Sequence, residues 1–444
     1  MRLKTFPEFN LAYTAPVLVT LVLIAILIAL PTGFEDKEIY RESELSSATV
    51  ISADDSSLVD TGLVRSGEQR CVVEIRDGAF AGTQAYAINM LNGSLEADKL
   101  FVPGDTALVR INADATGDKI LSVSMIDHYR ITDEFILAGL FFLLLVLFAG
   151  KTGLRAILSF GLTILLIWKV LVPLYLKGYQ PVWIGLGIAA VLTVLIIALV
   201  YGFDRRCLAA TAGALLGILV TCVLGVLFTD LYNIHGAVMA SSESLLYAGY
   251  SHLNLTQIFM ASIFIASSGA MMDLSVDITS AIQEVVEKRP DIRAREAIRS
   301  GLNVGRAAMG TMTTTLLLAY SGGYIALLMV FTAQGTPIAT IFNYKFVAAE
   351  LIHTIVGSFG LVTVAPLTAL CAGVLLTRKP ARRPIEGTDT PAGSDDPVDA
   401  MNNGNQTLRF PQFPATETVV TRGSFVPKRG LLGDADTTND NFHR

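Results

Sequence analysis

The stretch TDEFILAGLFFLLLVLFAG, residues 132–150, is a nearly unbroken run of apolar side chains that follows two acidic ones. A helix needs about 20 apolar residues to cross the hydrocarbon core of a bilayer. Further runs of this kind occur near residues 12–30, 154–176, 181–202, 207–229, 254–276, 306–332 and 347–376. The sequence therefore predicts an α-helical integral membrane protein with about eight transmembrane helices.

The composition agrees with this fold class. Of the 444 residues, 52% are hydrophobic and 16% are charged, whereas soluble domains carry roughly 25% charged residues. The net charge of −6 is uninformative alone, because charge in membrane proteins matters by location. The cysteines are Cys71, Cys207, Cys222 and Cys371. Their spacing matches no metal-ligand motif, so we expect neither a structural zinc nor a disulfide framework.

The first apolar run follows Arg2 and Lys4, as in a signal peptide. Its apolar part, from Val17 to Leu30, is long for a signal sequence, and Pro31-Thr32-Gly33 is not a small-x-small cleavage site. We interpret residues 1–33 as a cytoplasmic start and a retained first helix.

Lys and Arg side chains gather in alternate connections. With the N-terminus inside, the basic residues of the cytoplasmic connections are Lys151, Arg155, Arg205, Arg206, Lys288, Arg289, Arg293, Arg295, Arg299, Arg378, Lys379, Arg382 and Arg383. The short outer loops then hold only Lys177 and Lys345, and residues 230–253 contain no Lys or Arg. By the positive-inside rule, both termini are predicted to lie in the cytoplasm, with the chain in a bacterial plasma membrane.

Residues 34–131 are predicted to form an extracytoplasmic β domain. Polar and apolar residues alternate near 71–76, 86–90 and 107–111, and Asp77-Gly78 and Gly104-Asp105 are turn signals. A small barrel similar to an OB-fold and an irregular β sandwich both fit this pattern, which does not separate them.

Residues 132–376 are predicted to form a seven-helix bundle. Within it, residues 230–253 are predicted to form an outer loop with a short surface helix. Residues 277–302, which Pro290 interrupts, are predicted to form an amphipathic cytoplasmic helix that braces the bundle. Residues 377–444 are rich in Pro, Gly, Asp, Asn and Thr and are predicted to be a disordered cytoplasmic tail.

Four polar residues within the predicted spans are candidates for a proton or ion relay, because a charge in hydrocarbon costs at least about 2.5–3.5 kcal/mol on insertion scales. Asp273 lies in the inner half of the sixth span; it is either a relay carboxylate or an interfacial residue at an early helix end. Arg306 enters the seventh span and either pairs with Asp273 or extends to the interface.

Residues 311–315 of the seventh span, Thr-Met-Thr-Thr-Thr, either line a polar path or hydrogen-bond to their own helix. The other two relay candidates, Glu350 and His353, share one face of the eighth span at i, i+3 spacing. This spacing matches half of a carboxylate-bridged metal site, but the chain has no second Glu–His pair of this kind to complete the site. We therefore favour a hydrogen-bonded pair or a relay group over a metal site.

Enzyme signatures are missing from the sequence, which contains no HExxH, no GxSxG elbow, no P-loop and no GxGxxG after a strand. We expect no catalytic activity, no cofactor, no bound metal and no nucleic-acid partner. The predicted partners are the lipid bilayer and an unknown small-molecule or protein substrate, and a homo-oligomer is left open.

Four short motifs occur together: GAMMD at 269–273, NVGR at 303–306, MGTM at 309–312 and TLLLAY at 315–320. This combination resembles the YibE/F-like family of bacterial multi-pass membrane proteins, and Glu350, Gly357 and Pro366 continue it over most of residues 50–376. The resemblance implies an anchor helix, an outer β domain and a helical bundle, but no activity. The motif residues are Gly269, Asn303, Gly305, Gly310, Thr311 and Thr315.

Two positions depart from the family pattern, with Ala307 where an Asp is usual and Thr314 where an Asn is usual. A weaker similarity is to the membrane core of resistance–nodulation–division permeases and the SecD/SecF pair. It rests on an intramembrane GxxxD, an amphipathic helix and a Thr-rich helix that ends in Gly322-Gly323. That similarity implies a role for Asp273 in proton-driven motion, although this chain has two extra helices before the motif.

Three functions remain open from the sequence. The first is a secondary transporter or a permease driven by the proton-motive force. The second is a non-transporting envelope assembly or scaffold protein that acts through its outer domain. The third is an intramembrane metalloenzyme centred on Glu350 and His353, which we rank last.

Overall fold

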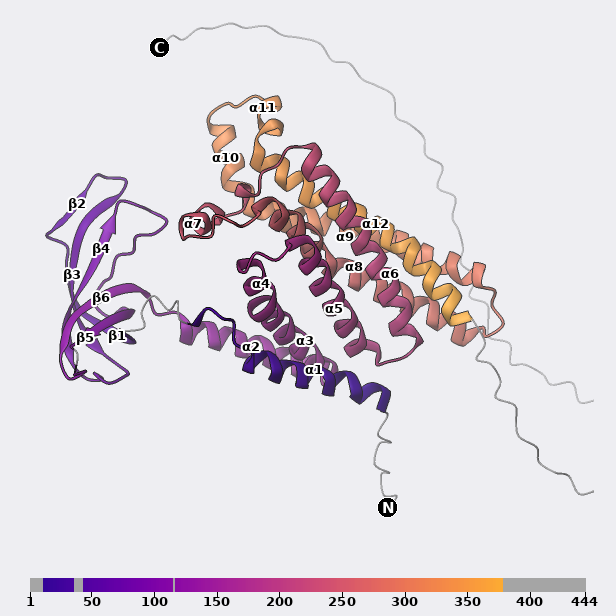
Figure 1. Cartoon of the computed structure of the whole chain (residues 1–444), viewed down its shortest axis with the longest axis horizontal. Helices are drawn as coiled ribbons and strands as arrows, with labels where there is room; N and C mark the ends of the chain where they lie inside the picture. The colour runs from indigo at the N-terminus through magenta and orange to yellow at the C-terminus, as the bar shows by residue number, and fades with distance from the viewer. Residues whose placement is uncertain (1–10, 36–42, 115, 378–444) are drawn as a thin grey trace, which may run out of the picture. The chain divides into compact units, whose positions relative to one another are not determined.

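The computed structural model describes residues 11–35, 43–114 and 116–377, which form a helical bundle and a small β domain (Figure 1). Within these residues, seven helical runs are long and apolar enough to cross a membrane. They are α2 (Ile131–Ala149); α3 (Lys151–Leu166) continued by η2 (Ile167–Leu171) and α4 (Val172–Leu176); α5 (Pro181–Tyr201); α6 (Arg205–Leu231); α8 (Leu255–Lys288); α9 (Ala294–Ser321) continued by η4 (Gly322–Tyr324) and α10 (Ile325–Ala333); and α12 (Lys345–Thr377).

The remaining predicted span, near residues 12–30, forms α1 (Leu11–Ala29). Its apolar part, Tyr13–Ala29, is shorter than the other spans. α1 packs against α3 and α5. Arg155 donates to the carbonyl oxygen of Tyr13 at 3.5 Å, and Lys169 Nζ donates to the carbonyl oxygen of Leu30 at 3.3 Å. Two cations thus tie both ends of α1 to the bundle.

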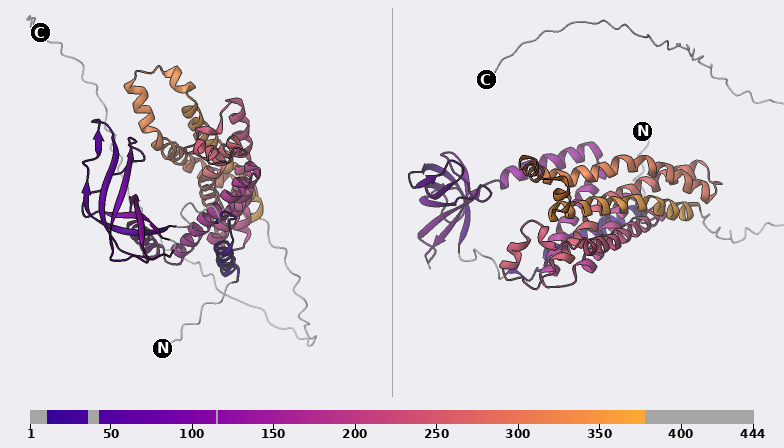
Figure 2. Two further views of the ribbon diagram at one scale, coloured as in Figure 1. Left: turned by 60° about the vertical axis from the view of Figure 1, so that its left-hand side comes forward. Right: turned by 90° about the horizontal axis from the view of Figure 1, so that it is seen from above.

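Helices α6, α8, α9 and α12 lie side by side and make extensive contacts with one another, with α9 exposed along one side (Figures 1 and 2). Small residues let their backbones approach closely, as is typical of membrane helices. A Cβ added at Gly217 of α6 would lie 2.9 Å from Val364 of α12, and one at Gly305 of α9 would lie 3.1 Å from both Ile278 and Ala365. Ser275 and Thr368 join α8 to α12 through a hydroxyl–hydroxyl contact of 3.0 Å.

Residues 277–302 do not form a separate helix in the structure. Helix α8 continues without a break to Lys288, and α9 begins at Ala294. The connection between them holds Pro290, which has no amide hydrogen to donate and clashes with the preceding turn. The predicted amphipathic segment is therefore the adjoining ends of two long helices.

Two connections contain short elements. Residues 232–254 hold η3 (Gly236–Val238) and α7 (Ser242–Tyr247), and the connection before α12 holds α11 (Ile338–Asn343). The predicted tail, residues 377–444, lies outside the described residues except for Thr377.

The β domain lies between α1 and α2 in the sequence. Its strands are β1 (Glu44–Asp54), β2 (Leu58–Asp60), β3 (Arg65–Ile75), β4 (Gln84–Asn92), β5 (Thr106–Ala113) and β6 (Ile120–His128). The sheet runs β1-β5-β6-β4-β3-β2, and β1 also pairs with β3. The five longer strands therefore close into a barrel, with β4 and β6 parallel and the other pairs antiparallel.

The barrel interior is filled by alternate residues of its strands, including Val50, Val73, Ile75 and Val109. A buried amide pair crosses this core. Asn89 donates to the side-chain oxygen of Gln69 at 2.9 Å, and Gln69 donates to the carbonyl oxygen of Phe101 at 2.9 Å. Because Phe101 also donates its amide to Gln69, the segment after β4 is fixed against the barrel.

Candidate functional site

Helices α8, α9 and α12 bring a group of polar side chains together around His353. On α12, His353 lies one helical turn after Glu350. Its Nε2 atom is 3.2 Å from the hydroxyl of Ser262 on α8. The ring lies between Phe259 of α8 and Tyr320 of α9, with centroid separations of 5.0 and 5.7 Å. His353 is thus held by residues from three helices.

The partners of Ser262 fix the role of the His353 ring. Ser262 donates its hydroxyl hydrogen to the carbonyl oxygen of Phe259 at 2.7 Å. A hydroxyl has one hydrogen to donate. Ser262 must therefore accept from His353, so in this arrangement the Nε2 atom of His353 carries the hydrogen. The other ring nitrogen, Nδ1, is then left as the acceptor of the neutral imidazole.

Glu350 is the second ionisable group of this cluster. It is half-buried, and its Oε1 atom is shielded from solvent without a hydrogen-bond partner among the described residues. The phenols of Tyr320 and Tyr324 lie close enough to interact electrostatically with the carboxylate. An unpartnered carboxylate oxygen is costly in a helical bundle, so Glu350 calls for a functional explanation.

The structure contains no hydrogen bond between Glu350 and His353, although their spacing led us to favour one. The physical reason lies in the neighbouring helices. The Nε2 atom of His353 is hydrogen-bonded to the hydroxyl of Ser262, and two aromatic rings pack against the imidazole and fix its orientation. A shared helix face does not by itself bring the two polar ends together.

Asp273 and Arg306 lie apart from this cluster. Asp273 is 11 residues beyond Ser262 on α8, which corresponds to about 16 Å along the helix. Both side chains are exposed within the chain, and no ion pair joins them. The structure therefore divides the four relay candidates into two groups at different depths, instead of one continuous path.

The threonine run of α9 is satisfied by its own helix. Thr311, Thr313, Thr314 and Thr315 each donate to a backbone carbonyl oxygen three or four residues earlier, at 2.8 to 3.3 Å. This is one of the two arrangements that the sequence left open. These hydroxyls retain their lone pairs as acceptors.

The family-motif glycines fall into two classes. Gly305 packs against Ile278 and Ala365, so its missing side chain makes room for neighbouring helices. Gly269 and Gly310 face open space, since a Cβ at either would meet nothing within 4 Å. Asn303, Thr311 and Thr315 are exposed as well.

In residues 11–35, 43–114 and 116–377, no group of three or more His, Cys, Asp or Glu side chains is arranged to hold a metal ion. Glu350 and His353 remain a pair without further ligands of these types.

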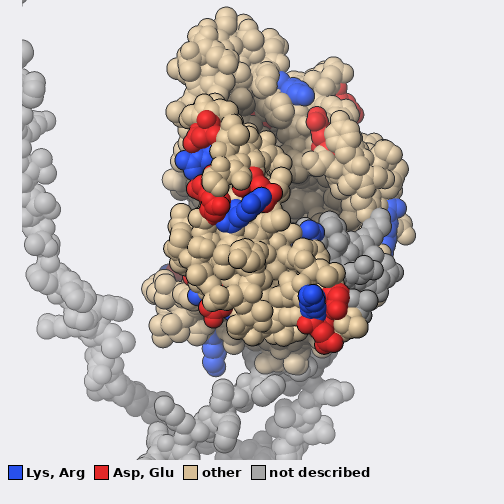
Figure 3. Space-filling view, turned by 90° about the vertical axis from the view of Figure 1, so that its left-hand side faces the viewer, with Lys and Arg blue, Asp and Glu red and all other residues tan. Residues whose placement is uncertain are grey.

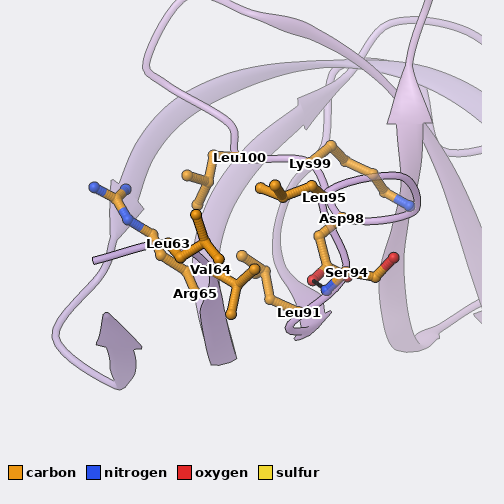
Figure 4. A pocket seen from close by; sticks show the side chains of 9 residues that line it. All are labelled: Leu63, Val64, Arg65, Leu91, Ser94, Leu95, Asp98, Lys99 and Leu100. Carbon is orange, nitrogen blue, oxygen red and sulfur yellow. Dashed lines mark hydrogen bonds between the residues drawn. The ribbon is translucent and has the colours of Figure 1, made fainter. Parts of the chain in front are cut away.

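The β domain carries a separate candidate surface, a cavity of about 210 Å³ beside the ends of β3 and β4. Figure 4 shows apolar side chains converging on it, among them Leu63, Leu91 and Leu95, while the charged ends of Arg65 and Lys99 point away from its centre. Leu63 and Leu95 are among the most exposed apolar residues of the domain, at 78% and 74%.

Acidic and basic side chains lie next to one another on the face shown in Figure 3, without a large patch of one sign. Two ion pairs of the β domain show the same mixing, Arg65 with Asp60 and Arg70 with Glu68. The apolar cavity is therefore the more distinctive feature of this domain.

Sequence reasoning did not identify Ser262, Tyr324 or the cavity residues of the β domain. Ser262 and His353 are separated by 91 positions, and no local pattern in either helix marks the contact. The exposed leucines near residues 63 and 95 were a usable signal, because they lie in polar segments between strands.

Long apolar helices, an interior of small and hydroxyl residues, and an inserted β barrel define a multi-pass membrane protein. A family model described as YibE/F-like protein matches residues 137–378, which is more than half of the chain. The chain belongs to this family. The match begins in α2 and leaves out the β domain, so it is narrower than the 50–376 expected from the motifs. The comparisons with curated proteins and with solved structures found no match.

Proposed function

We propose that this protein is a secondary transporter, or a permease driven by the proton-motive force, with Glu350 as its proton-binding group. The observation that carries the proposal is the shielded, unpartnered Oε1 atom of Glu350 inside a bundle of membrane-length helices. Ionisable residues within membrane spans usually mark proton or ion pathways. We assign the chain no enzymatic activity.

The neighbours of Glu350 fit this role. His353, which is neutral in this arrangement, lies one turn away, and the phenols of Tyr320 and Tyr324 lie close enough to interact electrostatically with the carboxylate. Residues of α8, α9 and α12 meet here, so a change in the charge of Glu350 would alter contacts between three helices. Such coupling of a proton to helix packing is what a proton-driven carrier requires.

Asp273 is the second group in this proposal, at a different depth on α8. The support for Asp273 is weaker than that for Glu350. It consists of the position of Asp273 in GAMMD and the similarity of this segment to the core of resistance–nodulation–division permeases. The substrate is a small molecule or a protein. We place the termini in the cytoplasm of a bacterial cell, because the basic residues of the connections favour this orientation.

The test is rescue of a strain lacking the gene by Glu350→Gln, at matched expression. Gln keeps the shape of the side chain but cannot exchange a proton. We expect Glu350→Gln to lose rescue and Glu134→Gln, at the exposed start of α2, to retain it. Rescue by Glu350→Gln at the wild-type level would overturn the role of Glu350. Asp273→Asn, tested alongside, decides whether the second group is also required.

A second candidate function is an envelope assembly or scaffold protein that acts through its outer domain. The cavity beside Leu63 and Leu95 favours it, because exposed apolar side chains around a hollow are typical of surfaces that receive a partner. A barrel of five strands with this closed path is the arrangement of OB-folds, which bind ligands on one side of the barrel.

A further inference from the structure

Two arginines from different helices meet at Tyr13, at the end of the bundle where α3 and α6 begin. The guanidinium carbon of Arg155, on α3, lies 5.8 Å from the centroid of the Tyr13 ring. Arg206, on α6, donates to the hydroxyl of Tyr13 at 2.8 Å and lies over the ring of Tyr201 at 5.4 Å. Helices α1, α3 and α6 thus each contribute one residue to a cationic site, the Tyr13 corner, which consists of Tyr13, Arg155 and Arg206.

Acidic side chains balance the positive charge of this corner only in part. Among the described residues, the acidic partner of the two arginines is Asp204, whose carboxylate binds Arg206 Nε at 2.7 Å and also caps the first turn of α6. Arg155 donates to two backbone carbonyl oxygens, at 3.3 and 3.5 Å. Lys151 lies one turn before Arg155 on α3, and like charges at this spacing repel each other. The corner therefore keeps a net positive charge.

Hydrogen-bond donors are also left over at the Tyr13 corner. A guanidinium group has five N–H donors, and within the described part of the chain Arg155 and Arg206 each use two of theirs. The hydroxyl of Tyr13 accepts from Arg206 and keeps its own hydrogen to donate. Guanidinium donors match the spacing of the oxygen atoms of a phosphate group. The corner thus combines the charge and the donors that bind a phosphate.

The residues beside the corner are apolar and exposed. Leu154, which precedes Arg155, is 55% exposed, and Leu208, two residues after Arg206, is 59% exposed. Both lie in the first turn of helices that are long and apolar enough to cross a membrane. They therefore lie where lipid headgroups meet the acyl chains. A phospholipid bound through its phosphate would place its chains against such side chains, whereas a soluble anion would not contact them.

We propose that the Tyr13 corner binds the headgroup of an anionic phospholipid from the leaflet at this end of the bundle. The phosphate accepts hydrogen bonds from Arg155, Arg206 and the hydroxyl of Tyr13, and Lys151 adds attraction at longer range. Basic pockets between membrane helices are suited to such headgroups. Because the three residues belong to three helices, the bound lipid also holds α1 against α3 and α6.

Native mass spectrometry of the full chain, purified in detergent and mixed with one lipid at a time, tests the proposal. We expect phosphatidylglycerol to bind about ten-fold more tightly than phosphatidylcholine with the same acyl chains, because only phosphatidylglycerol carries a net charge. Arg155→Gln should weaken the binding of phosphatidylglycerol about five-fold, as expected for one cation near an anionic surface, and leave that of phosphatidylcholine unchanged. Arg295→Gln, which removes an exposed cation from the first turn of α9, is the control and should keep the wild-type preference.

Tyr13→Phe is a second variant, which removes one hydroxyl and no charge, and it should weaken the binding of phosphatidylglycerol about three-fold. Equal affinity of the wild type for the two lipids, or wild-type affinity for phosphatidylglycerol in both variants, would overturn the proposal. Displacement of phosphatidylglycerol by an excess of inorganic phosphate would assign the corner to a soluble anion and would overturn the lipid as its ligand. These readouts do not use transport, so this proposal and the proposed function can fail separately.

Discussion

Single side chains set the chemistry that this protein can perform, and they differ mainly in whether their polar atoms find partners. His353 is held by Ser262 and two aromatic rings, so its orientation is fixed. Glu350, one turn before it, has a shielded oxygen atom without a partner. In the β domain, buried amides such as Gln69 and Asn89 are satisfied. Among the carboxylates of the described residues, Glu350 is the one with a buried oxygen atom that lacks a hydrogen-bond partner.

Cys71 is predicted to be unreactive in the folded β domain. It is buried in the barrel core, and burial raises the pKa of its thiol to about 11. The thiolate, which is the reactive form, is therefore scarce near neutral pH. Maleimide labelling at pH 7.5 of a variant that keeps only this cysteine should be slow in the native protein and rapid in denaturant. Equal rates in both states would contradict the prediction.

Asp77 is predicted to make the stability of the β domain fall at low pH. Hydrogen bonds from Ser46 and Ser47 lower the pKa of its carboxyl below the ordinary 3.8. A depressed folded pKa stabilises the domain fully above the unfolded value, and the stabilisation is lost as the pH falls below 3.8 through the folded value.

Asp77→Asn should therefore flatten the pH dependence of thermal unfolding below pH 4. Asp118→Asn, on the exposed β5–β6 turn, is the control and should keep the wild-type dependence. A slope that Asp77→Asn leaves unchanged would show that other carboxyls are responsible.

At the scale of elements, the bundle depends on close approach between helices, and the glycines show where. Gly213 on α6 lies against the backbone of Thr368 on α12, and Gly217 lies against Val364 one turn later. Gly187 on α5 faces open space. An added methyl group would therefore clash with α12 at Gly213 and Gly217, whereas Gly187 has room for it.

Gly213→Ala is predicted to destabilise the bundle by about 1–3 kcal/mol, because the added Cβ would overlap the α12 backbone. Gly187→Ala should be neutral or slightly stabilising, since Ala favours helix over Gly by up to about 1 kcal/mol. Thermal unfolding in detergent, followed by loss of soluble protein, compares the two. Equal midpoints would contradict the assigned α6–α12 contact.

The helices were largely predictable from the sequence, because each span depends on its own run of apolar residues. The adjoining ends of α8 and α9 were harder to predict, because amphipathic turns such as those around Ala294 and Ala297 continue a helix beyond the apolar run. The motif around Asp273 and Arg306 identified the family, but their separation could not be read from spacing. Which side of each helix faces its neighbour depends on contacts such as Gly305 with Ile278.

At the scale of the whole molecule, the family match and the β barrel occupy different parts of the chain. The match covers residues 137–378, and the barrel covers strands from Glu44 to His128. In the two proposals above, proton conduction is assigned to the first part and recognition of a partner to the second. The transport and scaffold proposals therefore predict different results when one part is removed.

Deletion of residues 45–125 separates these proposals. If transport through the bundle is the function, we expect partial or full rescue of a strain lacking the gene. If the protein works as a scaffold through its outer domain, rescue should be lost. Membrane levels of the shortened protein, measured by immunoblot, serve as the control. Complete loss at normal levels, together with full rescue by Glu350→Gln, would favour the scaffold function.

Infrared difference spectroscopy of the full chain in lipid vesicles tests the central claim most directly, because it detects the carbonyl stretch of a protonated carboxyl group. The account predicts that a pH titration of the wild type shows a band that Glu350→Gln removes and Glu134→Gln leaves in place. A spectrum of Glu350→Gln identical to that of the wild type throughout the titration would contradict proton binding at Glu350.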